Sequence, residues 1–127
     1  MKNLKAKDIM TRPVISEKKN TSAKDIAIRL VSGNFSGMPI TDDEERVIGV
    51  VTEHDLLNKV REGEDLVNLT AENIMENNPV TVDASQPLSD VLDIMIEHGI
   101  LRIPITDELR LVGVISRSDI LRHCMEK

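Results

Sequence analysis

Two short segments place a hydroxyl and a carboxylate at the same spacing. The segment GVVTEHD puts Thr52 three residues before Asp55, and GVISRSD puts Ser116 three residues before Asp119. A helix that begins at the hydroxyl presents backbone N–H groups to an anion such as phosphate. A carboxylate one turn into that helix can accept hydrogen bonds from both hydroxyls of a ribose. Hydroxyl and carboxylate together therefore indicate a nucleotide site, written twice.

The same residues also fit a helix start that binds nothing. In a capping box, a Ser or Thr caps the helix, and an acidic side chain three residues later bonds back to the backbone of the capping residue. Gly49 and Gly113 open the two segments. Because glycine has no side chain, we expect them to leave space where a ligand would approach. From these residues alone, both interpretations stand.

The two segments belong to an internal repeat that covers almost the whole chain. DIMTRPVI matches NIMENNPVT, and MPITDDEERVIGVVTEHDLL matches IPITDELRLVGVISRSDIL. Met10 and Met75 are 65 residues apart, as are Pro39 and Pro104, whereas the two glycines are 64 apart. Self-similarity at a nearly fixed separation indicates one structural unit written twice.

Each repeat is predicted to fold as strand, helix, strand, strand, helix. In both repeats, apolar residues recur at the i, i+3, i+4, i+7, i+8 spacing of an amphipathic helix. They are Ala23, Ile26, Ala27, Leu30 and Val31, and Leu88, Val91, Leu92, Met95 and Ile96. Strands are expected at residues 14–15, 38–40 and 47–51, and at 80–82, 103–105 and 111–115. The expected helix caps are Thr21 or Ser22 and Gly33-Asn34, and Ser85 with Pro87 and His98-Gly99.

We place the first repeat at residues 1–60, a charged linker at 61–72 and the second repeat at 73–127. A unit of about 60 residues buries too little surface to be stable alone. We therefore predict a mixed α/β (α+β) fold in which two βαββα repeats pack sheet to sheet about a pseudo-twofold axis, with a pair of clefts between them. Apolar residues ahead of each repeat should pack onto the core: Leu4 and Ile9, and Leu66, Val67 and Leu69.

The 127-residue chain is acidic, with a formal net charge of −6 and Phe35 as its one aromatic residue. Binding to a nucleic-acid backbone needs a concentrated basic face, so we expect no nucleic-acid partner. No apolar run reaches the ~20 residues of a membrane span, and the first ten residues lack the apolar core of a signal peptide. We therefore expect a cytoplasmic protein that does not bind a membrane. Cys124 is the one cysteine, and no Cys/His pair has zinc-ligand spacing, so no metal site is predicted.

The repeated motifs resemble a tandem pair of CBS domains (the cystathionine β-synthase domain repeat), also called a Bateman module. The resemblance rests on the DIM…P start, on MPITD and IPITD at residues 38–42 and 103–107, and on the doubled GVVTEHD and GVISRSD. It implies a regulatory module that binds adenosine-containing ligands in the clefts between repeats. It also implies a homodimer in which two pairs form a flat disc.

The resemblance assigns ligand roles to residues of each repeat. Thr52 and Ser116 would contact phosphate, and Asp55 and Asp119 would hold the ribose. Adenine would lie against the first strand and the residues around the strand proline: Val14, Ile15, Met38 and Pro39, and Val80, Thr81, Ile103 and Pro104. Those apolar residues are equally expected to serve only as core.

The two predicted sites differ in charge. Arg117 follows Ser116, and Arg102 precedes Pro104 by two residues. The resemblance places a basic residue of this kind at the phosphates, and a guanidinium beside a helix N-terminus favours an anion. The matching positions of the first repeat are Glu53 and Gly37. We therefore expect the second site to take a phosphorylated ligand, and the first to stay empty or take a less charged adenosine derivative.

Simpler interpretations remain for the charged residues. The two arginines also fit solvated surface charges, and they can equally reach a neighbouring cleft. His54 can contact the phosphate of a ligand and titrate near neutrality, but an exposed first-turn histidine is the commoner case.

The preferred function is a stand-alone, non-catalytic sensor that binds AMP, ADP or ATP, with NAD and S-adenosylmethionine as further candidates, and that signals to a protein target. An enzyme is disfavoured because general acid–base chemistry needs a converging pair of titratable groups, and only the ribose aspartates recur. A structural dimerisation unit whose sites have decayed is the remaining alternative. Helix faces proposed for a homodimer contain Leu56, Leu57, Val60, Ile120, Leu121 and Met125.

Overall fold

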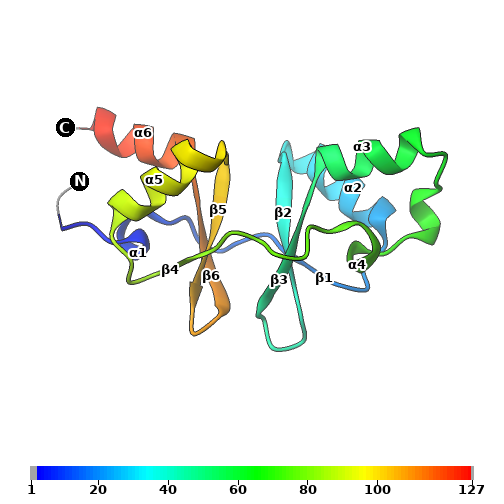
Figure 1. Ribbon diagram of the computed structural model, residues 1–127, viewed down its shortest axis with the longest axis horizontal. Coiled ribbons are helices and arrows are strands. Elements are labelled where there is room, and N and C mark those ends of the chain that lie inside the picture. Colours follow the sequence, from blue (N-terminus) through cyan, green and yellow to red (C-terminus); the bar gives the residue numbers. More distant parts are fainter. Residues whose placement is uncertain (1–2, 127) are drawn as a thin grey trace. The chain divides into compact units, whose positions relative to one another are not determined.

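The computed structural model describes residues 3–126, which form two compact units. The first-repeat unit comprises residues 15–79, and the second-repeat unit comprises residues 3–14 and 80–126 (Figure 1). The first-repeat unit contains β1 (Glu17–Lys18), α2 (Ala23–Gly33), β2 (Gly37–Thr41), β3 (Val47–Thr52), α3 (Glu53–Arg61), the 3₁₀ turn η1 (Leu66–Asn68) and α4 (Ala71–Ile74). The second-repeat unit contains α1 (Ala6–Ile9), β4 (Val82–Asp83), α5 (Leu88–His98), β5 (Arg102–Asp107), β6 (Arg110–Ser116) and α6 (Arg117–Met125).

The predicted βαββα order is confirmed in both units, and the fold is mixed α/β. Each unit has a three-stranded sheet, in the order β1-β2-β3 or β4-β5-β6. The first pair of strands is parallel and the second antiparallel. In each unit the two long helices lie on one face of the sheet (Figure 1). The packing of the two sheets on each other stays a prediction.

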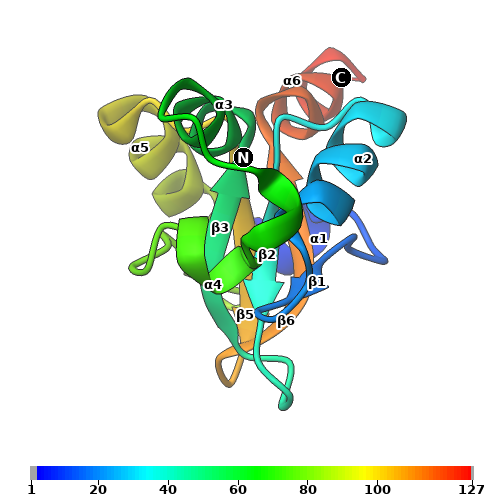
Figure 2. The same cartoon turned by 90° about the vertical axis from the view of Figure 1, so that its right-hand side faces the viewer.

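Each unit is completed by a short helix that precedes the other repeat in the chain. In the second-repeat unit, the amide of Ala6 in α1 donates to the Gln86 carbonyl at 2.9 Å, and the amide of Leu88 donates to the Leu4 carbonyl at 2.8 Å. In the first-repeat unit, Ala71 of α4 donates to Thr21 at 2.9 Å by the same pattern. Helix α4 lies beside β3 (Figure 2). The compact units are therefore made of exchanged segments.

This arrangement differs from consecutive segments at 1–60, 61–72 and 73–127. Residues 3–14 lie with residues 80–126, and the expected linker is an ordered part of the first-repeat unit. Leu66 and Leu69 pack against its core as predicted, and Leu4 and Ile9 pack against the core of the second-repeat unit. The prediction for Val67 is wrong, because this side chain is 57% exposed.

The apolar stripes of α2 and α5 form the cores, with one shared exception. Ala23, Ile26 and Leu30 of α2 are buried, as are three matching residues of α5, Leu88, Val91 and Met95. The last predicted position of each stripe is wrong: Val31 is 78% and Ile96 is 77% exposed. At 3.6 residues per turn, position i+8 is rotated by about 80° from position i, so it lies at the edge of the stripe.

The closing helices contribute one buried residue each. Leu56 of α3 and Ile120 of α6 are 7% and 4% exposed and belong to the cores, so they are not available for a dimer contact. The other four residues named for that contact remain exposed: Leu57, Val60, Leu121 and Met125.

Helix boundaries follow most of the predicted caps. The Ser22 hydroxyl caps α2, and Asn34 and Gly99 end α2 and α5 in the left-handed conformation. Ser85 was expected to cap α5 and does not; its amide and hydroxyl donate to the Asp83 carboxylate. Pro87 occupies the cap position instead.

The first strand of each repeat begins later than predicted. Strand β1 is Glu17–Lys18 rather than residues 14–15, and β4 is Val82–Asp83 rather than 80–82. Only these residues find a parallel partner, since Glu17 pairs with Ile40 and Val82 pairs with Ile105. Residues 14–15 and 80–81 therefore lie before the strands and are not part of them.

Candidate functional site

Both hydroxyl–carboxylate segments form complete capping boxes. The Thr52 amide donates to Asp55 Oδ2 at 2.8 Å, and the Asp55 amide donates to Thr52 Oγ1 at 3.2 Å. The corresponding bonds between Ser116 and Asp119 are also 2.8 and 3.2 Å. The four residues are half-buried. The structural interpretation of these segments is therefore confirmed at both helix starts.

The first-turn amides are already bonded, which weakens the prediction of an open anion cradle. The cap amides donate to the aspartates and the aspartate amides to the hydroxyls, as above. The amide of Glu53 donates to the Ser36 carbonyl at 2.9 Å, and that of Arg117 donates to Leu101 at 3.0 Å. At most one amide of each first turn, that of His54 or Ser118, is left for an anion.

Thr11 lies at the start of α6, although it is 105 residues away from Ser116 in the sequence. Its backbone pairs with Val114 at the outer edge of β6. Its hydroxyl donates to Asp119 Oδ1 at 3.3 Å. Thr11 is not among the predicted site residues, because adjacency along the chain places it with the first repeat, whereas the exchanged segment brings it to the second-repeat unit.

Three arginines surround the same helix start. Arg102 pairs with Ser116 across β5 and β6, so the two side chains leave the same face of the sheet. Arg122, one turn after Asp119, donates to its Oδ1 at 3.3 Å. The Asp119 side chain is 12% exposed, so its carboxylate is held in place. The Nε of Arg117 donates to the Ile100 carbonyl at 3.2 Å, which directs this exposed side chain toward the end of α5.

The corresponding positions of the first-repeat unit carry no arginine. Gly37 pairs with Thr52 across β2 and β3. Asn58 occupies the position of Arg122, and Glu53 that of Arg117. His54 is exposed on the first turn of α3. The charge difference predicted from sequence is therefore present around the two helix starts.

Gly49 and Gly113 each make room for a methionine, and the expectation that they also leave space for a ligand stays a prediction. A Cβ at Gly113 would lie 2.5 Å from Met10 Sδ, and one at Gly49 would lie 2.4 Å from Met75 Sδ. Each glycine thus accepts the methionine of the exchanged segment. This contact explains why the glycine and the DIM or NIM motif recur together.

The residues predicted for the adenine divide between the two faces of each sheet. Met38 and Ile103 are buried among core residues of the helices, which favours the core interpretation for them. Pro39 and Pro104 alternate with these residues and therefore lie on the opposite face. Four more residues precede the strands, of which Val14 and Thr81 are half-buried and Ile15 and Val80 are exposed. Val14 lies in the second-repeat unit and Ile15 in the first.

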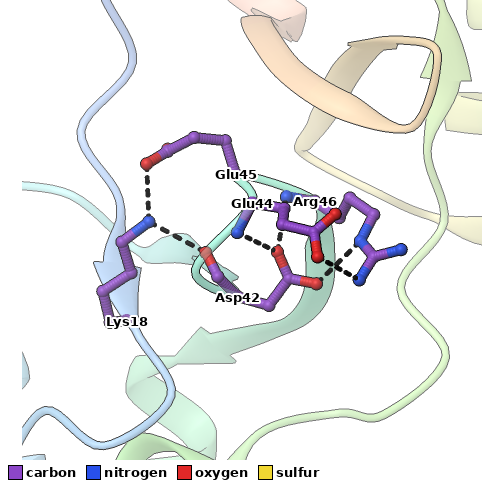
Figure 3. A network of polar contacts seen from close by, with 5 residues as sticks. All are labelled: Lys18, Asp42, Glu44, Glu45 and Arg46. Carbon is purple, nitrogen blue, oxygen red and sulfur yellow. Dashed lines mark hydrogen bonds and ion pairs between the residues drawn. The ribbon is translucent and has the colours of Figure 1, made fainter.

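A polar network around Asp42 closes the β2–β3 turn (Figure 3). Asp42 Oδ1 accepts bonds from the amides of Glu44 and Arg46 at 2.9 and 3.0 Å, and Oδ2 accepts one from Arg46 Nε at 2.8 Å. Desolvation opposes ionisation, but the amide and guanidinium of Arg46 and the amide of Glu44 outweigh it and lower the pKa of Asp42. Lys18 Nζ bonds to the Asp42 carbonyl at 2.9 Å and to Glu45 at 2.6 Å. These charges pair within the turn and with Lys18 of β1, so the network stabilises the hairpin turn and joins it to the neighbouring strand.

Neither a metal centre nor a membrane span is found in residues 3–126. No group of three or more His, Cys, Asp or Glu side chains in this range is arranged to hold a metal ion. Of the helices that these residues form, none has the length and apolar content needed to cross a bilayer.

Each of the two repeats matches the same known protein family. The family model for the CBS domain matches residues 6–62 and again residues 71–126. Hypoxic response protein 1 of Mycobacterium tuberculosis is 30% identical over 122 residues, which cover 95% of this chain and 85% of that protein.

Several solved structures are similar to this protein over nearly its full length. The crystal structure of Hypoxic Response Protein I with two coordinated zinc ions has a TM-score of 0.86 at 30% identity and covers 94% of this chain and 98% of that one. The CBS domain pair of MJ0100, in complex with 5′-methylthioadenosine and S-adenosylmethionine, has a TM-score of 0.83 at 27% identity, with 97% of each chain covered. CBSX2 in complex with AMP has a TM-score of 0.84 at 26% identity and 96% coverage of each chain. With two matches to the family model and these neighbours, the chain belongs to the CBS domain family, as a tandem pair.

Proposed function

We propose that this CBS pair is a non-catalytic regulatory module that binds an adenosine-containing nucleotide at the start of α6. The observation that carries the proposal is the gathering of Thr11, Ser116 and Asp119 within hydrogen-bond distance, with Arg102 opposite Ser116. Hydroxyls and a guanidinium suit a phosphate, and a fixed carboxylate suits the diol of a ribose. Pro104 is buried on the same sheet face as Arg102, and we keep it as a proposed adenine contact.

The relatives support this ligand class. CBSX2 was crystallised with AMP, and the MJ0100 pair with S-adenosylmethionine and 5′-methylthioadenosine. These ligands share the adenosine group and differ in the charge beyond it. Adenosine is therefore the proposed common element, with AMP, ADP or ATP favoured at the arginine-rich site of this chain.

A binding role suits the site better than catalysis. General acid–base catalysis needs two titratable groups that converge on one reacting bond. At the start of α6, the Asp119 carboxylate is bonded to its own capping residue, to Thr11 and to Arg122. Three donors point at this one carboxylate, so its role in the structure is that of a hydrogen-bond acceptor.

Ligand binding can be tested without labelling the protein. The chain contains no Trp or Tyr, so a 260 nm absorbance band of the purified protein would come almost wholly from bound nucleotide. Calorimetric titration with AMP, ADP, ATP, NAD and S-adenosylmethionine then compares the candidates. If none of the five binds, the adenosine proposal is wrong.

A pair of matched variants tests the preference for the α6 site. Asp119→Ala and Asp55→Ala each remove the carboxylate of a capping box with the same bond lengths, so their cost in helix stability should be similar, about 1 kcal/mol. We expect AMP affinity to fall at least tenfold in Asp119→Ala and little in Asp55→Ala, as measured by calorimetry. Equal losses would contradict the ranking of the two sites.

We also propose that the protein forms a homodimer through α3 and α6. Leu57 and Val60 are 66% and 54% exposed, and Leu121 and Met125 are 61% and 82% exposed. An exposed leucine therefore recurs at the same position of both closing helices, and each is followed one turn later by a further exposed apolar residue. A surface repeated in this way can pair with a second copy of the chain through a two-fold axis.

Sedimentation equilibrium measures this association directly. Leu57→Glu and Leu121→Glu should convert the dimer to monomer, whereas Leu109→Glu in the β5–β6 turn, where Leu109 is 69% exposed, should leave it intact. A wild-type protein that stays monomeric at high concentration would rule out the dimer. That result would also remove the alternative of a purely structural dimerisation unit.

A further inference from the structure

The residue that follows the half-buried methionine of the exchanged segment differs in charge between the two units. Thr11 follows Met10, and Glu76 follows Met75. Both occupy the same backbone position: Thr11 exchanges bonds of 2.8 and 3.2 Å with Val114, and Glu76 exchanges bonds of 2.9 and 3.3 Å with Val50. Both side chains are exposed.

The backbone match places Glu76 next to the predicted ligand position of the first-repeat unit. Thr11 reaches Asp119 from this position, at 3.3 Å. Asp55 sits in a capping box with the same bond lengths as that of Asp119. The side chain of Glu76 therefore leaves the backbone beside the α3 start, where Thr11 leaves it beside the α6 start.

The charges near the two helix starts then have opposite balance. At α6, the carboxylate of Asp119 is accompanied by Arg102, Arg117 and Arg122. At α3, Asp55 is accompanied by Glu53 and Glu76, and the positions of Arg102 and Arg122 are Gly37 and Asn58. A phosphate placed at α3 would face acidic groups, whereas a cationic group would be attracted to them.

We propose that position 11 or 76 sets the charge preference of each site. Thr11 allows a phosphorylated adenosine ligand at α6, and Glu76 selects an adenosine derivative with a neutral or cationic substituent at α3. The inference rests on the proposed adenosine binding and adds which chemical class each site accepts. A unit charge within several ångström of a ligand group, partly screened by water, changes affinity by about tenfold.

Exchange of the two residues tests the proposal. Thr11→Glu is measured in an Asp55→Ala background and Glu76→Thr in an Asp119→Ala background, so that one site is observed at a time. The probes are AMP, which is anionic, 5′-methylthioadenosine, which is neutral, and S-adenosylmethionine, whose sulfonium is cationic. Thr11→Glu should lower the affinity for AMP about tenfold. Glu76→Thr should raise the affinity for AMP and lower that for S-adenosylmethionine by a similar factor.

Matched controls separate local charge from net charge. Ser89→Glu, exposed on α5, adds the same charge as Thr11→Glu, and Glu72→Thr, exposed on α4, removes the same charge as Glu76→Thr. Neither control should change the preference among probes. Glu76→Gln, which keeps the side-chain shape, should reproduce Glu76→Thr if charge is the cause.

The outcomes distinguish the two levels of proposal. If the parent variants bind probes but the exchanged residues leave the ratio of AMP to S-adenosylmethionine affinity unchanged, the charge proposal is wrong and the adenosine proposal stands. If the wild-type protein binds none of the probes, both proposals are wrong. Thermal unfolding of each variant confirms that a loss of binding is not a loss of fold.

Discussion

The helix starts at Thr52 and Ser116 have the same backbone and different surroundings. Their capping boxes have matching bond lengths, and the amide of Glu53 or Arg117 bonds to the carbonyl of the residue just before β2 or β5. The side chains around the two helix starts differ in type and charge. Thr11 and Arg122 bond to Asp119, and Arg102 and Arg117 also lie at the start of α6, whereas two glutamates, a glycine and an asparagine hold the corresponding positions at the start of α3.

This comparison separates residues that fold the repeat from residues that define a site. Bonds common to both copies satisfy helix ends and dock the exchanged segment, so they are needed whether or not a ligand binds. Residues that differ at equivalent positions have no such shared structural role. The ligand preference of each copy should therefore be sought in Arg102 and Gly37, and in Thr11 and Glu76.

One charge introduced at a buried position should destabilise the packing of an exchanged segment on its unit. Ala6 of α1 is fully buried in the core of the second-repeat unit. Ala6→Asp should destabilise that unit by about 3 kcal/mol or more, since an unpaired charge in an apolar core is costly. Residue-resolved hydrogen exchange should show lost protection in β5 and β6, while β2 and β3 keep theirs.

The control and the reciprocal change complete that test. Lys7→Asp alters the exposed neighbour in α1 and should leave exchange rates unchanged. Ala71→Asp, at the fully buried matching position of α4, should expose β2 and β3 instead. Loss of protection in β2 and β3 on Ala6→Asp would mean that α1 serves the first-repeat unit, contrary to the structure.

The two motif glycines, Gly49 and Gly113, should differ in how well they tolerate substitution by alanine. In both units an added Cβ displaces a methionine side chain, but at Gly49 it also lies 2.9 Å from the Glu76 carbonyl oxygen, which is backbone. We expect Gly49→Ala to cost about 2 kcal/mol and Gly113→Ala about 1 kcal/mol in the free energy of unfolding, because a side chain moves more easily than backbone. Urea unfolding measures both.

A double-mutant cycle identifies the cause. If Met75 is the obstacle, Gly49→Ala should cost less when Met75 is already Ala. If the glycine instead keeps space for a ligand, Gly49→Ala would lose adenosine binding at unchanged stability, and the packing explanation would be wrong.

The sequence predicts local elements well and their partners poorly. Helix periodicity, the αL caps at Asn34 and Gly99 and both capping boxes depend on residues within one turn of each other, and all were predicted. The first strands were misplaced because their position depends on pairing with Ile40 and Ile105, which are distant in the chain.

Segment exchange explains the part of the site that the sequence did not reveal. A repeat period of 65 residues is the same whether the DIM segment packs on its own repeat or on the other. Thr11 could therefore be aligned with Glu76 but not placed beside Asp119. Arg102, in contrast, is assigned to the phosphates by the resemblance alone, and the register of β5 and β6 then pairs it with Ser116.

The hairpin turns offer the smallest contrast between the units, through Asp42 and its counterpart Asp107. Asp42 is bonded to two amides and a guanidinium (Figure 3), and its pKa is lowered. Asp107 instead pairs with Arg110 across a two-residue turn. A carboxyl whose pKa is lower in the folded state contributes stability above its unfolded pKa of about 3.9. That contribution is lost as the pH falls through the folded-state pKa.

Asp42→Asn should therefore lower stability at pH 7 and flatten its decline below about pH 5. Urea unfolding of the wild-type protein and the variant from pH 7 to pH 2 provides the comparison. A residual slope is expected in Asp42→Asn, because the hydroxyl and amide of Ser85 lower the pKa of Asp83 in the second-repeat unit. If Asp42→Asn leaves the pH profile of stability unchanged, the turn network is not a source of the acid sensitivity, and its bonds have no energetic consequence.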